Sequence, residues 1–415
     1  MKLAMSAAHG GFGSERVPLG GGAAVFERLI ASGVFADTDF HLLGAGPRHY
    51  STGTYHQLAG LERSPSALGM MEYSRFCQEF GDATTRKALA LKPDVLLCHD
   101  ISEGPNVASL ASAGIKVVTI FHVDVVDIFS RLYLKSALSP KRLTHYYRTF
   151  RSLPWPSLLK LVFEKQQEVC DRGALSIVPS GGAEQLLRDC YPHSNTPIQT
   201  IGWGAPALPF VDQQIVEQAH SLRAQHEIPQ DHRVLLTLSR LSPEKAQHRL
   251  LQAVAFAEKN DRMPADITVV IAGAPAFMEG ERHFRRLKEL SSQLQTRVVF
   301  PGHVGGLEKA SWYRTATLFV VNSLHESYGL TTLEAMQQGC PVVAVKSFGT
   351  TDTVNSQVGR LVLPGPELEI RLWGTIELML QSDLEAMGHN AREYTGRHRF
   401  QDAASEVRKI LDSLS

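Results

Sequence analysis

Two glutamates in the second half of the chain have the spacing of a ligand-binding site. Glu326 lies in a polar turn after the apolar run 318–321, and Glu334 lies in the helix predicted to begin near Gly329. At a rise of 1.5 Å per residue, Glu334 lies on the order of 9 Å further along the helix axis. The N–H groups of a first helical turn bind anions, so a ligand with an anion between two hydroxyl-bearing groups suits this layout. A nucleotide sugar, which joins ribose, diphosphate and hexose, is such a ligand.

The spacing of these glutamates is also compatible with a purely structural role. Two glutamates this far apart near a helix start occur often by chance, one of them as a charge that complements the helix dipole. His325-Glu326 begins like the zinc motif HExxH, but the fifth residue is Gly329, so the sequence disfavours zinc.

Two cations lie on a loop earlier in the same half of the chain. Arg240 and Lys245 follow the apolar run 234–238, and Pro243 stands near the start of the next predicted helix. A guanidinium can bind a diphosphate through two hydrogen bonds, and an ammonium adds a point charge. The two side chains could therefore bind a diphosphate together.

The triplet Asp37-Thr38-Asp39 has the form of a metal-binding DxD motif. It lies between a predicted helix and the strand 40–43, where aspartates commonly serve as caps and turns. We therefore expect the triplet to be structural. We expect no metal site, and no cofactor besides a nucleotide-sugar co-substrate.

Two features of the first half suggest further ligand contacts. A glycine-rich loop separates a strand predicted at 2–7 from a helix predicted at 23–31, and its N–H groups could contact a phosphate or a sugar, although a flexible turn would also account for the glycines. The loop lacks the third glycine of the dinucleotide fingerprint, which disfavours a dehydrogenase. His99 and His122 each follow an apolar strand, at the edge where ligands bind in open α/β sheets. Either histidine alone is more often structural, but the two together indicate a site.

Length and composition limit the class of protein. A chain of 415 residues is too long for one ordinary core, so we expect two domains. Its 42 basic and 42 acidic residues cancel, which disfavours nucleic acid as a partner. Five cysteines without a CxxC pair indicate reduced thiols, and no apolar run is long enough for a signal peptide or a membrane span. We therefore expect a soluble, cytoplasmic protein.

The segment 128–163 has no acidic residue and interleaves aromatic side chains with seven cations: Arg131, Lys135, Lys141, Arg142, Arg148, Arg151 and Lys160. Such a segment could make a weak peripheral contact with the inner face of an anionic membrane. It could instead hold an anionic acceptor, or form a solvated helical pair.

The glutamate region resembles the signature of retaining glycosyltransferases of family 4, which have the GT-B fold. The matching residues are Ser323, Glu326, Gly329, Leu330, Glu334, Ala335, Met336, Gly339, Pro341, Val342, Val343, Gly349 and Gly359. Tyr328, Phe348 and Asp352 depart from the pattern, where phenylalanine, glycine and glutamate are usual. Arg240 and Lys245 resemble the R-x4-K phosphate motif of the family and precede the glutamates in the expected order.

The resemblance implies an α/β protein of two doubly wound Rossmann-like domains, whose parallel sheets face each other across a cleft. Residues 1–205 would form the acceptor-side domain, and residues 206–394 the domain that binds the nucleotide sugar. The C-terminal helix, at about 395–415, would return to the first domain.

The resemblance also implies a role for each site residue. Arg240 and Lys245 would bind the diphosphate. Glu334 would bind the ribose and Glu326 the hexose hydroxyls near the anomeric carbon, while His122 would lie against the donor sugar. The remaining donor-binding residues would be Gly21 and Gly22 of the first glycine loop, His303 and Val304 near the nucleobase, and Ser327, Tyr328, Gly329 and Leu330 at the helix start.

The activity implied is metal-independent transfer of a hexose from a UDP- or GDP-linked donor to an acceptor hydroxyl, with retention. Polysaccharide, glycolipid or small glycoside synthesis would use such a reaction, and the acceptor would be lipid-linked or anionic. A GT-B sugar-nucleotide epimerase and a catalytically silent sugar-nucleotide binder are the alternatives.

Overall fold

The computed structural model describes residues 1–13, 20–58, 60, 64–132, 134, 137–153, 155, 157–276 and 279–415. Within them the chain divides into two compact units, Met1–Gly202 together with Asp402–Ser415, and Trp203–Gln401. The boundary predicted from the sequence lies after residue 205. Part of the predicted glycine loop, residues 14–19, lies outside the described residues, as does Lys135 of the basic segment.

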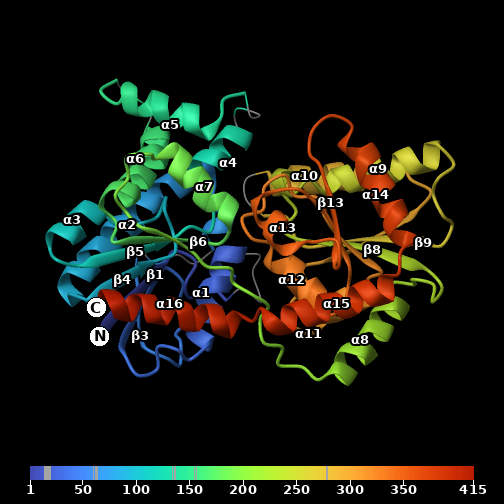
Figure 1. Ribbon diagram of the computed structural model, residues 1–415, viewed down its shortest axis with the longest axis horizontal. Helices are drawn as coiled ribbons and strands as arrows, with labels where there is room; N and C mark the ends of the chain where they lie inside the picture. Colours follow the sequence, from blue (N-terminus) through green and yellow to red (C-terminus); the bar gives the residue numbers. More distant parts are fainter. Residues whose placement is uncertain are drawn as a thin grey trace. The chain divides into compact units, whose positions relative to one another are not determined.

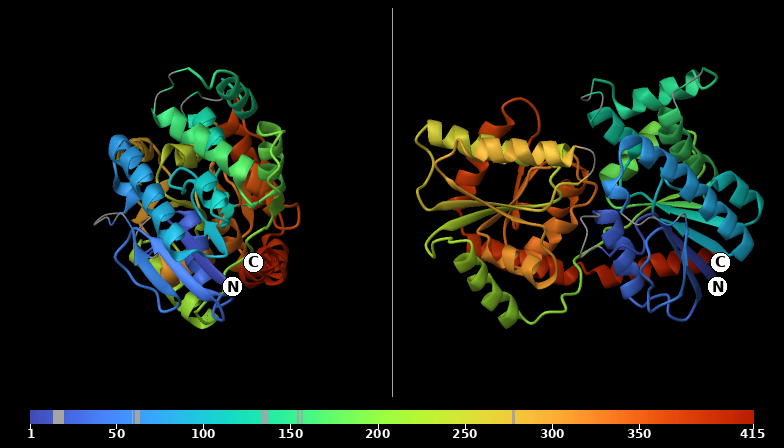
Figure 2. Two further views of the ribbon diagram at one scale, coloured as in Figure 1. Left: turned by 90° about the vertical axis from the view of Figure 1, so that its left-hand side faces the viewer. Right: turned by 180° about the vertical axis from the view of Figure 1, so that it is seen from behind.

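The first unit is built on a seven-stranded parallel sheet of order β3-β2-β1-β4-β5-β6-β7. Its strands are β1 (Lys2–Ala7), β2 (Asp39–Gly44), β3 (Thr54–Gln57), β4 (Val95–Cys98), β5 (Lys116–Ile120), β6 (Leu175–Val178) and β7 (Ile198–Thr200). The central strands β4 and β6 are buried along their whole length, as their unbroken apolar runs require. Helices lie on both faces of this sheet (Figure 2). They are α1 (Gly21–Ala31), α2 (Met70–Leu91), α3 (Val107–Ser112), α4 (Val125–Leu132), α5 (Pro140–Thr149), α6 (Ser157–Arg172), α7 (Gly181–Cys190) and most of α16 (Phe400–Leu414).

The second unit is built on a six-stranded parallel sheet of order β10-β9-β8-β11-β12-β13. Its strands are β8 (Arg233–Leu238), β9 (Ile267–Ala272), β10 (Arg297–Gly302), β11 (Leu318–Val321), β12 (Val342–Val345) and β13 (Gly359–Val362). Its helices are α8 (Asp212–Gln225), α9 (Gln247–Lys259), α10 (Gly280–Ser291), α11 (Gly306–Thr315), α12 (Leu330–Gln337), α13 (Phe348–Thr353), α14 (Leu368–Leu380) and α15 (Leu384–Arg397), with a short 3-10 turn at Pro243–Lys245. The expected fold class, two parallel-sheet Rossmann-like domains, is confirmed.

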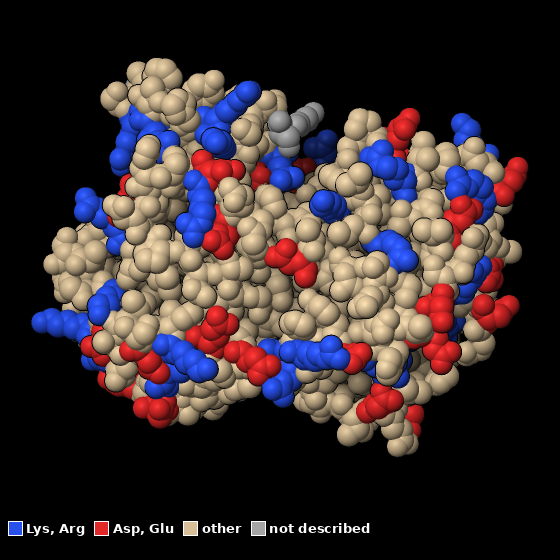
Figure 3. All heavy atoms as spheres, viewed as in Figure 1, with Lys and Arg blue, Asp and Glu red and all other residues tan. Residues whose placement is uncertain are grey.

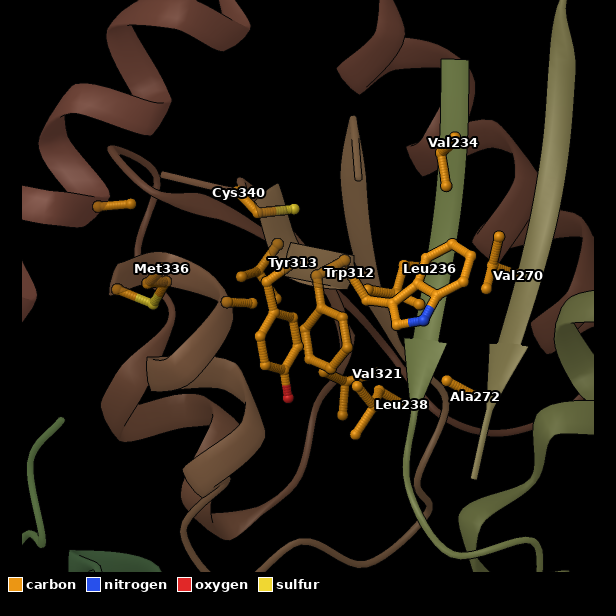
Figure 4. Close-up of a cluster of buried hydrophobic side chains, with 14 of the residues drawn as sticks. Val234, Leu236, Leu238, Val270, Ala272, Trp312, Tyr313, Val321, Met336 and Cys340 are labelled. Atoms are coloured by element: carbon orange, nitrogen blue, oxygen red, sulfur yellow. The ribbon is translucent and has the colours of Figure 1, made fainter. Parts of the chain in front are cut away.

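Two hydrophobic layers enclose the sheet of the second unit. Leu236 and Val270 pack in the layer that contains α11, whereas their neighbours Leu235 and Val269 pack in the layer of α9, α10 and α14. Helices α11 and α9 lie on opposite faces of the sheet (Figure 1). This alternation follows from the two-residue period of a strand. Trp312 of α11 packs with Leu236 and Val270 at the centre of the first layer (Figure 4). Because hydrophobic layers cover both faces of this sheet, its strands are fixed in place. The loops that follow their carboxyl ends therefore start from fixed positions.

The C-terminal region is two helices and not the single one predicted at 395–415, because the chain leaves the helix at His398 and Arg399. Ala205 explains the break: its N–H donates to the His398 carbonyl at 2.8 Å, and its carbonyl accepts from Phe400 N at 2.8 Å. The ring of Phe400 stacks on Trp203 at a centroid distance of 6.0 Å. The strand-like pairing at residue 205 thus ends α15, and α16 starts afresh.

The triplet at 37–39 has structural partners in the first unit. Arg408 of α16 donates to Asp37 Oδ1 at 2.5 Å and to the Val34 carbonyl at 2.7 Å. This partner lowers the pKa of Asp37. Asp39 lies 3.2 Å from Nε2 of His41. Asp37 therefore fixes the C-terminal helix to the turn before β2.

Candidate functional site

The loop between β11 and α12 carries Glu326 and is held in place by the start of α13. The Gly349 N–H donates to the Glu326 carbonyl at 2.8 Å. A Cβ at Gly349 would lie 2.2 Å from the Tyr328 Cα, so only glycine permits this approach. Gly329 closes the loop with a φ of 92°, a left-handed conformation that favours glycine. The helix then begins at Leu330, one residue after the predicted start.

The structure pairs two residues to which the sequence assigns different parts of the ligand. Lys245 Nζ lies 2.7 Å from Glu326 Oε2, and the side chains are only 15% and 18% exposed. Burial raises the pKa of Glu326, but the charge and hydrogen bond of Lys245, with smaller effects of His325 and Ser323, outweigh it and leave the pKa below its usual value. The pair is therefore a preformed charged contact at the start of α12.

An acidic residue that the sequence does not single out lies between the two cations. Glu244 Oε1 accepts from the Ser242 hydroxyl at 2.5 Å and lies 3.9 Å from Nη2 of Arg240. The carbonyl of Glu244 accepts a hydrogen bond from Leu324 N at 3.3 Å. This contact places the loop of Arg240 and Lys245 beside the loop of Glu326.

Glu334 is held by two side chains of α11. Lys309 Nζ lies 3.1 Å from Oε1, and the Tyr313 hydroxyl donates to Oε2 at 3.1 Å. Glu334 is only 7% exposed, so these partners fix its rotamer. One feature of the sequence points to these two partners. Lys309 and Tyr313 have the i, i+4 spacing that puts two side chains on the same face of a helix.

The remaining predicted residues of the second unit lie on the loops around these side chains. His303 is exposed and Val304 is buried after β10, which shifts its register against β9 between Val299 and Gly302. Tyr328 is half-buried, and its hydroxyl accepts from Gly204 N at 3.2 Å. Ser327 and Leu330 are half-buried and Gly329 is buried.

The two histidines of the first unit lie at the same edge of its sheet and contact each other. β4 and β5 are parallel neighbours, and Nδ1 of His99 lies 3.0 Å from Nε2 of His122. Gly21 and Gly22 begin α1, and a Cβ at Gly22 would lie 3.0 Å from the ring of His122. Burial, followed by the nearby His9, lowers the pKa of His122 to about 3. Burial and then His122 lower the pKa of His99, so the pair is neutral at physiological pH.

We expect the neutral His122 to make the protein sensitive to acid. The unfolded chain takes up a proton near the ordinary pKa of 6.5, whereas the folded chain does so only near 3. Stability is therefore unaffected above pH 6.5 and is lost as the pH falls below it, by about 1.4 kcal/mol per pH unit. Urea unfolding at pH 7.5 and 5.5 should show a smaller loss for His122→Asn than for the wild type. The exposed His193→Asn is the matched control, and an equal loss in all three chains would contradict the expectation.

The basic segment combines exposed cations with exposed apolar side chains. Tyr147 and Phe163 pack in a small buried cluster, while Tyr146, Phe150 and Leu153 are about half exposed. Lys and Arg side chains gather on the part of the first unit that contains α4 and α5, at the upper left (Figure 3). Among the described residues, no helix is both long and apolar enough to cross a membrane.

Comparison with known proteins found a matching family and several sequence relatives. The family described as "Glycosyl transferases group 1" matches residues 218–394. D-inositol 3-phosphate glycosyltransferase of Saccharomonospora viridis is 29% identical over 255 residues, which are 59% of this chain and 57% of that protein. The corresponding protein of Kribbella flavida is 34% identical over 164 residues, 38% of each chain. The chain thus aligns with less than two thirds of these relatives.

Solved structures match over nearly the whole chain. Sucrose-phosphate synthase of Thermosynechococcus elongatus has a TM-score of 0.76 at 18% identity, covering 100% of this chain and 98% of that one. HepE of Anabaena, solved in complex with UDP-glucose, has a TM-score of 0.67 at 17% identity with 100% of both chains covered. WaaG, a glycosyltransferase involved in lipopolysaccharide biosynthesis, has a TM-score of 0.67 at 14% identity, covering 98% and 99%. The chain therefore has the GT-B fold, and its second unit carries the sequence pattern of glycosyl transferases group 1.

Proposed function

We propose that this protein is a glycosyltransferase that moves a hexose from a nucleotide-sugar donor to an acceptor hydroxyl with retention of configuration. The observation that carries the proposal is the arrangement of charged side chains around α12 in the second unit. The Lys245–Glu326 pair lies at the start of α12, and Glu334 is oriented within that helix by Lys309 and Tyr313. The family match over residues 218–394 and the UDP-glucose complex of HepE support it.

The proposed chemistry is loss of a diphosphate from the anomeric carbon. Negative charge then grows on the leaving phosphate, where Arg240, Lys245 and the N–H groups at the start of α12 stabilise it. Glu334 binds the ribose, and Glu326 binds hexose hydroxyls. Lys245 must therefore move part of its interaction from Glu326 to the phosphate when the donor binds. The acceptor hydroxyl attacks from the face that the diphosphate leaves, which retains the configuration.

A ligand screen tests the donor. A nucleotide sugar that binds only the folded chain raises the melting temperature, by an amount set by its concentration relative to Kd. We expect a rise with at least one of the UDP-, GDP- and ADP-linked hexoses, and smaller rises with the free nucleosides. No rise with any of them at millimolar concentration would contradict the proposal. Transfer of labelled hexose to an added acceptor then separates a transferase from an epimerase and from a silent binder.

We expect transfer to continue in the presence of EDTA. The proposed site supplies two cations and a helix N-terminus to the leaving diphosphate, and the aspartate triplet has a structural use in the turn before β2. Initial rates should be equal within error before and after chelation. Loss of transfer that Mg²⁺ or Mn²⁺ restores would contradict the prediction.

We also propose that the acceptor is anionic or lipid-linked and that the segment 128–163 makes a weak contact with an anionic membrane. The word phosphate occurs in the name of a relative, D-inositol 3-phosphate glycosyltransferase. It also occurs in the name of a structural neighbour, sucrose-phosphate synthase. The exposed Tyr146, Phe150 and Leu153 favour an interface between apolar and charged surroundings.

Liposome flotation measures this contact. Polybasic segments gain about 1 kcal/mol per cation near an anionic bilayer, and the gain falls with salt. We expect flotation with anionic liposomes at low salt, its loss at high salt, and its loss when Arg142, Arg148 and Arg151 are changed to glutamine. Absence of flotation at low salt would exclude the membrane and leave either an anionic acceptor or a plain solvated face.

A further inference from the structure

A buried amide lies behind the loop that carries Arg240. Gln247 is the first residue of α9, and its side chain is fully buried. Its Nε2 donates to the Ser239 hydroxyl at 2.8 Å and to the Arg240 carbonyl at 2.7 Å. Its Oε1 lies 2.8 Å from Nε2 of His283 on α10. The amide thus joins α9, the Arg240 loop and α10.

The partners of Gln247 determine its orientation. The Arg240 carbonyl can only accept a hydrogen bond, so the group of Gln247 that faces it is the Nε2 amide NH2. The amide oxygen then faces His283, whose Nε2 carries the proton that it donates. Burial and then Arg286 lower the pKa of His283, although Glu244 acts in the opposite direction, so the ring is a neutral Nε2–H donor. All three contacts are therefore compatible at neutral pH.

Backbone hydrogen bonds hold the other side of the same loop. Ser239 N donates to the Ala272 carbonyl at 3.1 Å, and Leu241 N donates to the Ala274 carbonyl at 2.9 Å. The loop is therefore clamped between the end of β9 and the Gln247 amide. Because the backbone of Arg240 is held on both sides, its side chain starts from a fixed position.

We propose that Gln247 is a positioning residue for Arg240, setting the backbone from which the guanidinium reaches the donor diphosphate. The inference rests on the proposed function, because it requires Arg240 to bind a phosphate. The competing possibility is a merely structural role, in which Gln247 satisfies buried polar groups and adds stability. The two roles differ in whether the effect of Gln247 on phosphate binding depends on Arg240.

A double-mutant cycle measures that dependence. The probe is whichever of UDP, GDP and ADP binds the wild type most tightly, with its Kd measured by calorimetry. Gln247→Met keeps the approximate volume and removes every hydrogen bond. We expect it to weaken the Kd about tenfold in the wild-type chain and less than about twofold in an Arg240→Ala chain.

Two controls separate this effect from a general loss of stability. Ile376→Val, at a fully buried position of α14, should lower the unfolding midpoint and leave the Kd unchanged. The matching nucleoside lacks the diphosphate, so its Kd should be the same for Gln247→Met and the wild type. If Gln247→Met does not fold, Gln247→Leu replaces it, because a leucine side chain also lacks any group that donates to the Arg240 carbonyl.

The outcomes distinguish the inference from the function on which it rests. Failure of the wild type to bind all three nucleoside diphosphates would overturn the proposed function. Binding by the wild type, with an unchanged Kd for the folded Gln247 variant, would overturn only the positioning role. An equal loss with and without Arg240 would also overturn it, since Gln247 would then act independently of the guanidinium.

Discussion

Lys245→Ala is expected to lower kcat at saturating donor by roughly 10²-fold or more, on the scale of deleting a single group that stabilises a transition-state charge. In the proposed reaction Lys245 faces the diphosphate as it leaves, so its charge matters most in the transition state. Initial rates over a range of donor concentrations separate kcat from KM. Near-wild-type turnover at saturating donor would overturn the assignment.

The ion pair makes a second variant necessary. Lys245→Ala also removes the nearest cation from Glu326, whose pKa should then rise and whose buried charge should destabilise the fold. Adding Glu326→Gln to Lys245→Ala should recover the unfolding midpoint but not the turnover. The exposed Lys259→Ala at the end of α9 controls for the loss of a lysine. Recovery of turnover in the double variant would show that the loss arose from the fold.

Gly349→Ala is expected to destabilise the second unit by roughly 3 kcal/mol, the upper part of the range for overpacking. The added Cβ would lie 2.2 Å from the Tyr328 Cα and 2.3 Å from its nitrogen, and backbone atoms cannot move aside as a side-chain end can. Displacing that segment also moves the neighbouring Glu326, so nucleoside diphosphate affinity should fall as well.

Gly374→Ala is the matched control for this variant. Gly374 lies in α14, where an added Cβ meets nothing within 4 Å. It should therefore gain about 0.5–1 kcal/mol from the higher helix propensity of alanine and leave ligand affinity unchanged. Urea unfolding and calorimetry on both variants give the comparison. Equal stabilities for Gly349→Ala and the wild type would show that the α13 contact does not hold the loop.

The sequence by itself determined the architecture and the elements on which the proposed site residues lie. Runs such as 318–321 and 342–345 are apolar without interruption, and a strand of that kind is stable only when both faces are covered. Alternation of such strands with helices leads to parallel sheets by right-handed crossovers. It also places Glu326 before α12 and Glu334 within it, because strand, turn and helix are set by local sequence.

The sequence also predicted that His99 and His122 lie at the same edge of the sheet. Both residues follow buried strands, and the carboxyl ends of neighbouring parallel strands lie at one edge of a sheet. Nδ1 of His99 lies 3.0 Å from Nε2 of His122, so the two side chains are in contact. Their neutral state depended on the burial of that edge, which only the packed fold supplies.

Only the tertiary structure decided which side chains are partners across elements. Lys245 is 81 positions from Glu326, and Lys309 is 25 positions from Glu334, so no local pattern links them. The break at His398 arises in the same way, from a bridge between residues 205 and 399. Local sequence sets the periodicity that makes a helix or a strand. The distance between two side chains on different elements depends on how the packed layers align them, and the layers form only when the whole chain has folded.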